Sequence, residues 1–213
     1  MSRLYPIYVD VGGRTCCVVG GGPIAEGRAR TLAEHGAHVR LVAPDLTPGL
    51  EDMLAQNAIH DYRQRRYEAH DVTGCTLVVA ATDDRAVNLA VRDDARAAGA
   101  LCNVADDPSA CDFQVPALVR RGDLTFAVTT GGASPVVAAA VRRRLEGVFG
   151  PEWGDLLELL SEFRPAMKRR YPDTAARSAA VRDLLEGDLL DLLAAGHRDA
   201  ARALVAAAAG EGA

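Results

Sequence analysis

Short apolar runs alternate with helical patterns through the first half of the chain. Residues 16–19 form a continuous apolar run that ends in three glycines, and residues 76–81 form another that ends at Thr82. Such runs predict strands buried on both faces, and the helices between them predict a parallel sheet. The predicted strands lie at residues 16–19, 39–43, 59–65, 76–81 and 101–105, and the predicted helices at 23–35, 48–57 and 85–98.

The pattern changes near Cys111. Residues 124–129 predict one more strand, and a helix over 136–147 follows Ser134 and Pro135, which suit the N-cap and the first helical position. From residue 151 the pattern is helical only, with predicted helices at 153–171, 175–186 and 188–194 and a last one that ends near 208. We therefore expect an α/β fold with a parallel-sheet domain over residues 1–112, a strand-and-helix segment over 113–147 and a small α-helical C-terminal domain over 148–213.

Composition narrows the class of protein. The chain has 213 residues, of which 49% are hydrophobic and 25% charged, as in a globular protein of one or two domains. The net charge of -5 argues against a nucleic-acid surface. No run approaches the roughly 18 apolar residues of a membrane-spanning helix, and the N-terminus lacks the apolar stretch of a signal peptide. We expect no membrane contact and a cytoplasmic location.

The cysteines and histidines show no metal-binding spacing. The five cysteines include no Cys-x-x-Cys pair, and the five histidines form no His-Glu-x-x-His motif. Cys16, Cys17 and Cys102 lie in apolar runs, where cysteine behaves as a small hydrophobic residue. We predict no metal site and a structural role for these cysteines.

The sequence Gly20-x-Gly22-x-x-Ala25 lies between a predicted strand and a predicted helix. In a dinucleotide-binding Rossmann domain the first glycine permits a tight turn, and the second lets the backbone approach a pyrophosphate. The free N–H groups and partial positive charge of the helix N-terminus attract the phosphates. This context predicts nucleotide binding, and the alternative is a tight strand-to-helix turn without a ligand.

A carboxylate is expected at the tip of the second strand, where it would bind the adenosine ribose. The sequence there reads Ala43-Pro44-Asp45, so Asp45 lies at about the right distance but beyond a proline. Its alternative role is that of a helix cap or turn residue. No arginine follows to hold a 2′-phosphate, which favours NAD over NADP.

Two polar clusters should meet the glycine loop at the carboxyl edge of the sheet, because ligands of such sheets collect there. They are residues 82–84 (Thr-Asp-Asp) and residues 103–107 (Asn-Val-Ala-Asp-Asp). Asp83 or Asp84 is expected to cap the following helix. Asp106 is a candidate acid/base group, and a turn before Pro108 is the alternative explanation of the acidic pair at 106 and 107.

Two basic triplets lie in the second half of the chain, at residues 142–144 and 168–170. Such triplets are typical of solvated helix faces. They could instead receive a polyanionic substrate.

Taken in order, these motifs resemble the precorrin-2 dehydrogenase/sirohydrochlorin ferrochelatase family, which occurs alone or as the N-terminal module of siroheme synthase. The methyltransferase half of siroheme synthase is absent, so the resemblance is to the stand-alone form. The matching motifs are Leu4-Tyr5-Pro6-Ile7-Tyr8, Val18-Val19-Gly20-Gly21-Gly22-Pro23-Ile24-Ala25, Val42-Ala43-Pro44, Ala80-Ala81-Thr82-Asp83-Asp84, Asn103-Val104-Ala105-Asp106-Asp107-Pro108, Cys111-Asp112-Phe113 and Thr129-Thr130-Gly131-Gly132-Ala133-Ser134-Pro135.

The resemblance implies NAD-dependent removal of two hydrogens from precorrin-2, which gives sirohydrochlorin for siroheme biosynthesis. In bifunctional members, insertion of Fe²⁺ as a substrate follows and yields siroheme. It also implies a homodimer whose interface lies at 113–147. The essential aspartate of the family maps onto Asp106. The expected cofactor-binding residues are Gly20, Gly21, Gly22, Pro23, Ile24, Pro44 and Asp45, to which the strand-end argument adds Thr82 and Asn103.

Alternatives remain beside this enzyme. One is a nucleotide-sensing regulatory module that binds NAD without catalysis, and another is an oxidoreductase with a different small substrate. Ferrochelatase activity, the metal and the downstream tetrapyrrole pathway stay open. Thr130 stands where some siroheme synthases carry a phosphorylatable serine, so we infer nothing about such regulation. A regulatory module needs no Asp106 loop, so turnover of precorrin-2 separates the first alternative from the enzyme.

Overall fold

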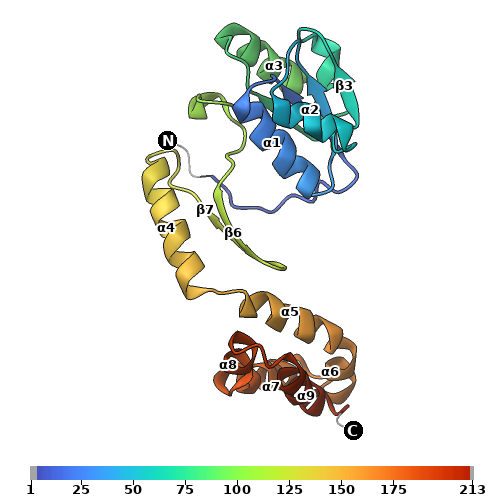
Figure 1. The fold of residues 1–213 in the computed structure, drawn as a ribbon, viewed down its shortest axis with the longest axis vertical. Coiled ribbons are helices and arrows are strands. Elements are labelled where there is room, and N and C mark those ends of the chain that lie inside the picture. The colour runs from blue at the N-terminus through green and yellow to red at the C-terminus, as the bar shows by residue number, and fades with distance from the viewer. Residues whose placement is uncertain (1–3, 212–213) are drawn as a thin grey trace. The chain divides into compact units, whose positions relative to one another are not determined.

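The computed structural model describes residues 4–211. The chain divides into two compact units, Met1–Val115 and Pro116–Ala213. Figure 1 shows the first unit as a sheet with helices and the second as a hairpin followed by helices. Each unit is described by itself below.

The N-terminal unit contains a parallel five-stranded sheet, as the apolar runs predict. Its strand order is β3-β2-β1-β4-β5, so the order reverses between β1 and β4. Val19 at the end of β1 is in register with both Val42 on β2 and Ala80 on β4, which brings three carboxyl ends to one edge. The strands are β1 Thr15–Val19, β2 His38–Val42, β3 Asp61–Arg63, β4 Leu77–Ala80 and β5 Leu101–Val104.

Helices cover both faces of this sheet (Figure 1). On one face lie α1 (Pro23–Glu34) and α2 (Pro48–Ala55), and on the other lie α3 (Arg85–Ala97) and the short 3-10 helix η1 (Ala69–Val72). Ala25 and Ala29 are fully buried, because these small side chains let α1 pack closely on the sheet. The Rossmann-like fold class is therefore confirmed.

Helix starts follow the capping residues of the sequence. The Thr47 side chain accepts a hydrogen bond from the Leu50 N–H at the start of α2. The Asp84 side chain accepts one from the Ala86 N–H at 2.8 Å at the start of α3, which confirms the expected cap. A second 3-10 helix, η2 (Pro108–Ala110), follows β5.

The C-terminal unit opens with an antiparallel hairpin. β6 (Ala117–Arg121) pairs with β7 (Leu124–Val128), and α4 (Pro135–Val148) follows. The sequence pattern predicted β7 and α4 but missed β6. The partner of β7 is therefore a strand of the same chain, so the apolar pattern of β7 does not by itself require a second subunit.

The remaining helices enclose a core of their own. Leu159, Phe163, Leu189 and Val205 are buried in it. The single helix expected over 153–171 is wrong, because α5 ends before Phe163 and a new helix starts at Arg164. Pro165 cannot donate the next hydrogen bond of a continuous helix. The helices are α5 Glu152–Glu162, α6 Arg164–Arg170, α7 Thr174–Glu186, α8 Leu189–Ala194 and α9 Arg198–Ala209.

Among residues 4–211, no helix has both the length and the apolar character needed to cross a membrane.

Candidate active site

A cavity of about 410 Å³ lies at the carboxyl ends of β1, β2 and β4. Because the strand order reverses between β1 and β4, this is where doubly wound sheets bind ligands. Six of the predicted cofactor residues lie in it. Its lining consists of Gly20, Gly21, Gly22, Pro44, Asp45, Leu46, Thr47, Ala81, Thr82 and Asp83.

The three glycines of the loop have different roles. Gly20 has φ +127°, and a Cβ there would lie 2.3 Å from the carbonyl oxygen of Ala81. A Cβ on Gly21 would lie 1.8 Å from the carbonyl oxygen of Asp45. A Cβ on Gly22 would meet nothing within 4 Å, although Gly22 lines the cavity. The first two glycines therefore permit close packing, and the third leaves room for a ligand against the backbone.

The start of α1 lies beside this room. Gly22 is the N-cap and offers no side-chain hydrogen bond to the first turn, and Pro23 occupies the first helical position. The N–H groups of an uncapped first turn and the helix dipole attract anions. Ile24 in the same turn is 46% exposed. The loop and the helix start fit a dinucleotide pyrophosphate.

Asp45 is exposed at the rim of the cavity together with Pro44. The helix-cap role that was the alternative for Asp45 belongs to Thr47. Within the described residues the Asp45 carboxylate has no hydrogen bond or ion pair, so it is available to ribose hydroxyls.

Thr82 is held in place by a residue that the sequence reasoning missed. The Asn88 side chain on α3 is buried and makes three hydrogen bonds with the backbone and hydroxyl of Thr82. Asn88 shares the buried stripe of α3 with Val91 and Ala95. A polar residue in an apolar stripe was the signal that could have identified it.

Asn103 does not line the cavity. Its side chain is 8% exposed, donates to the Phe113 carbonyl at 2.9 Å and lies 3.4 Å from the Cys111 sulfur. The Asn103 side chain thus holds the segment that follows β5 through Phe113, and the predicted contact of Asn103 with a cofactor stays a prediction.

Asp106 follows the carboxyl end of β5. It is exposed and has φ +61°, a left-handed conformation that aspartate tolerates better than most residues. In the described part of the chain, its carboxylate has no hydrogen bond or ion pair. Backbone strain of this kind is frequent at functional sites. Asp106 is a free carboxylate at the same edge of the sheet as the cavity.

The carboxylate of the neighbouring acid, Asp107, is instead held by hydrogen bonds. It accepts hydrogen bonds from Ser109 at 2.6 Å and from Arg85 at 2.9 Å. The bond from Ser109 and the Arg85 charge lower the pKa of Asp107. The Cys111 sulfur, 3.3 Å from the Asp107 carbonyl and 3.2 Å from that of Val104, closes the base of the same loop. The turn interpretation therefore suits Asp107, whereas among the described residues no such interaction holds the Asp106 carboxylate.

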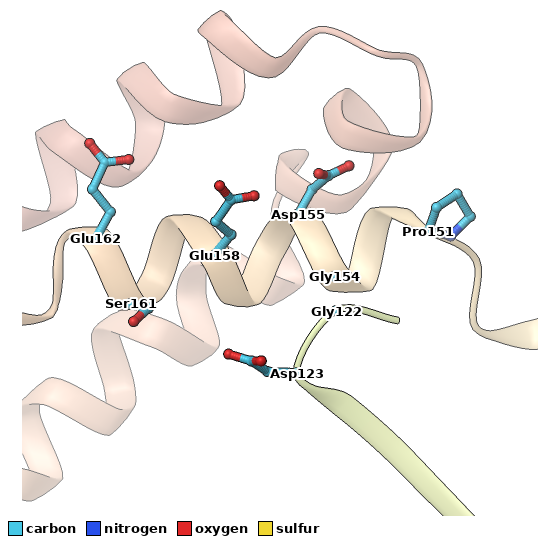
Figure 2. Close-up of a pocket in the computed structure, with 8 residues that line it drawn as sticks. All are labelled: Gly122, Asp123, Pro151, Gly154, Asp155, Glu158, Ser161 and Glu162. Carbon is cyan, nitrogen blue, oxygen red and sulfur yellow. The ribbon is translucent and has the colours of Figure 1, made fainter. Parts of the chain in front are cut away.

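A second hollow, of about 640 Å³, lies in the C-terminal unit. Figure 2 shows three acids along α5 and Asp123 of the hairpin turn around it. Arg198 pairs with Asp155 and Glu158 at 2.7 Å, and Arg202 pairs with Glu162. None of the residues that line the hollow is basic, and the arginines beside it are paired with its acids, so the hollow offers no free cation to a dinucleotide phosphate. No cluster of three or more His, Cys, Asp or Glu able to hold a metal occurs among residues 4–211.

The basic triplets are partly used within the chain. Arg142 pairs with Glu146, whereas Arg143 and Arg144 are exposed. Arg169 pairs with Glu211 at 2.6 Å, and Arg170 donates to the carbonyl of Ala207. Most of this charge lies on solvated helix faces.

Three family models match consecutive parts of the chain. Residues 7–117 match a family described as NAD(P)-binding, which is more than half of the chain. Residues 121–147 match the central region of sirohaem biosynthesis proteins, and residues 152–208 match the sirohaem synthase dimerisation region. This named dimerisation region lies after the segment 113–147 expected from the resemblance.

The chain is similar to full-length proteins and to a solved structure. It is 42% identical to the siroheme synthase of Chromobacterium violaceum and 38% identical to that of Pseudomonas fluorescens, over 94% of this chain and 43% of each relative. It thus spans less than half the length of these relatives. The structure of SirC, precorrin-2 dehydrogenase, matches with a TM-score of 0.73 and 26% identity, over 87% of this chain and 91% of that one. The chain belongs to the NAD(P)-binding family that forms the N-terminal module of siroheme synthases.

Proposed function

We propose that this protein is an NAD-dependent dehydrogenase that converts precorrin-2 to sirohydrochlorin. The observation that carries the proposal is the free carboxylate of Asp106, held in a left-handed conformation at the sheet edge that also forms the dinucleotide cavity. The likeness to SirC, precorrin-2 dehydrogenase, supports the choice of substrate.

The cavity residues would hold the cofactor. Gly22 and the first turn of α1 would bind the pyrophosphate, and Asp45 would accept hydrogen bonds from the ribose. A carboxylate at that position repels a 2′-phosphate, so NAD is favoured over NADP. When bound, NAD supplies the hydride acceptor.

Asp106 would accept the proton that the dehydrogenation releases. Removal of two hydrogens from precorrin-2 releases one hydride and one proton, and a carboxylate beside the reacting carbon accepts the proton. Asp106 has no competing partner in the described chain, so its lone pairs are available. The same carboxylate would accept pyrrole protons if Fe²⁺ is inserted as a second substrate.

We further propose that the protein works as a homodimer. Helix α4 exposes four valines, of which Val136 is 75% and Val148 67% exposed, with Val137 and Val141 between them. Burying such a face against a second copy is favourable, because exposed apolar patches commonly mark interfaces. The family match to a dimerisation region supports the oligomeric state.

An absorption time course tests the activity. Purified protein with precorrin-2 and NAD should form sirohydrochlorin and NADH in equal amounts, and omission of NAD should abolish the reaction. Binding of NAD without turnover would favour the regulatory module instead. Addition of Fe²⁺ to the sirohydrochlorin formed, after NAD is removed, then reads out metal insertion separately.

A further inference from the structure

Arg28 on α1 is a partly buried cation that has no partner among residues 4–211. In the part of the chain that the structure describes, every other half-buried arginine donates to a carboxylate or a carbonyl, and Arg28 has neither a hydrogen bond nor an ion pair. The partnered arginines are Arg40, Arg63, Arg65, Arg92, Arg121, Arg142 and Arg177. Withdrawing a charge from water without a partner is unfavourable, so an unpaired cation suggests a ligand site.

Arg28 lies near the middle of α1, on the stripe of the helix that begins beside the cofactor loop. Residues four apart lie on one face of a helix, so Ile24, Arg28 and Leu32 form one stripe along α1. Ile24 lies in the first turn beside the glycine loop, and Leu32 packs in the same cluster as Phe113. The stripe therefore faces the chain that follows β5.

Cys111 gives an independent sign of this proximity. Its sulfur makes hydrogen bonds with the backbone of Val104 and of Asp107. These two residues flank Asp106 in its loop. Burial raises the pKa of the Cys111 thiol, and the Arg28 charge opposes that rise. The Arg28 charge therefore acts on Cys111, whose sulfur closes the base of the loop that carries Asp106.

The chemistry of a guanidinium limits the ligand to an anion. The cofactor pyrophosphate is expected at the uncapped first turn of α1, one turn before Arg28. A tetrapyrrole substrate carries carboxylates around its ring, and a guanidinium binds a carboxylate through two parallel hydrogen bonds. This substrate class rests on the function proposed above.

We propose that Arg28 binds a carboxylate side chain of the tetrapyrrole and so orients the macrocycle between the cofactor and Asp106. Arg28 contributes binding and takes no part in proton transfer. Loss of this contact should weaken substrate binding and leave NAD binding intact.

The test compares Arg28→Gln and Arg28→Lys with wild type, and Arg30→Gln is the matched control. Arg30 lies two positions further along the same helix but is exposed and pairs with Glu26 at 3.1 Å. Arg28→Gln should raise KM for precorrin-2 about 10-fold or more, as expected for a lost charge-assisted hydrogen bond. The kcat and the Kd for NAD should stay unchanged, Arg28→Lys should recover part of the loss, and Arg30→Gln should behave as wild type.

Equilibrium binding of sirohydrochlorin, followed by its absorption, separates this proposal from the proposed function. If wild type binds sirohydrochlorin and Arg28→Gln does not, the proposed contact between Arg28 and the tetrapyrrole is supported, even if the protein does not oxidise precorrin-2. If the enzyme is active, an unchanged KM and an unchanged affinity for sirohydrochlorin in Arg28→Gln would contradict the proposed contact between Arg28 and the tetrapyrrole. A weaker Kd for NAD would also overturn it, because Arg28 would then serve the cofactor.

Discussion

Asn88 holds Thr82 by three hydrogen bonds. Its Oδ1 accepts from the Thr82 N–H at 3.0 Å and from the hydroxyl at 2.7 Å, and its Nδ2 donates to the Thr82 carbonyl at 2.9 Å. One buried side chain on α3 thereby fixes the end of β4 where it forms a wall of the cofactor cavity.

Asn88→Ala should therefore impair both stability and cofactor binding. It leaves the Thr82 backbone groups without these partners, which should lower the free energy of unfolding by about 1–3 kcal/mol. Urea denaturation measures this change, and calorimetry measures the Kd for NAD. Ala90→Gln, an exposed change on the same helix, is the control and should leave both values near wild type.

Substitutions of adjacent glycines should separate folding from NAD binding. Gly22→Asp has open space and should fold normally, but its charge would occupy the expected position of the pyrophosphate and weaken NAD binding at least about 100-fold. Gly21→Ala should instead destabilise the fold, because its Cβ would lie 1.8 Å from the Asp45 carbonyl oxygen. Thermal melting and NAD titration of both variants check this. A folded Gly22→Asp protein with wild-type affinity would contradict the assignment of the loop.

Asp71 should make the stability of the N-terminal unit depend on pH. Burial alone would raise the pKa of this carboxyl, but hydrogen bonds from Arg65, the Glu68 N–H and Arg63 outweigh burial and hold the pKa well below its usual range. A lowered pKa contributes stability that is fully present above about pH 4 and is lost as the pH falls further.

Asp71→Asn should accordingly cost on the order of 3 kcal/mol of unfolding free energy at pH 7. The difference between wild type and variant should shrink when urea denaturation is repeated near pH 3. A difference that grows on acidification would have the wrong sign for this ion-pair cluster.

The proposed dimer interface can be located with two sets of substitutions. Val137→Asp combined with Val141→Asp places two charges on the exposed face of α4 and should weaken dimerisation at least about 100-fold, as read by sedimentation velocity. Leu185→Asp, on α7, is the control from the region 152–208 and should leave the dimer intact. If only Leu185→Asp yields monomers, the interface lies in the helical region.

Periodicity predicted the parallel sheet, and the glycine motif predicted its cavity, because both are local in sequence. The hairpin strand β6 was missed since Ala117–Arg121 has only three apolar residues before two arginines. Gly122-Asp123 between two strands is a hairpin signal that could have found it.

Contacts between distant residues were harder to predict. Asn103 was expected at the cofactor because it belongs to a polar cluster at the carboxyl end of a strand, but its amide donates to the Phe113 carbonyl ten residues later. Conversely, Asn88 binds Thr82, six residues earlier, and its only sign in the sequence is its place in the apolar stripe of α3. Such roles depend on which side chains the fold brings together.

The carboxylate of Asp106 is the centre of the proposed mechanism. Asp106→Asn keeps the shape of the side chain and tolerates the left-handed conformation, so the protein should fold and bind NAD as wild type does. Asp107→Asn, at the neighbouring acid that Arg85 and Ser109 hold, is the matched control and should keep most activity.

The most direct measurement is the rate of NAD-dependent oxidation of precorrin-2 by these two variants and wild type, at saturating NAD. We expect Asp106→Asn to lose about 10²–10⁴-fold in kcat, as for a positioned acid/base group, while Asp107→Asn stays within about 10-fold of wild type. Near-normal turnover by a folded, NAD-bound Asp106→Asn protein would contradict the account.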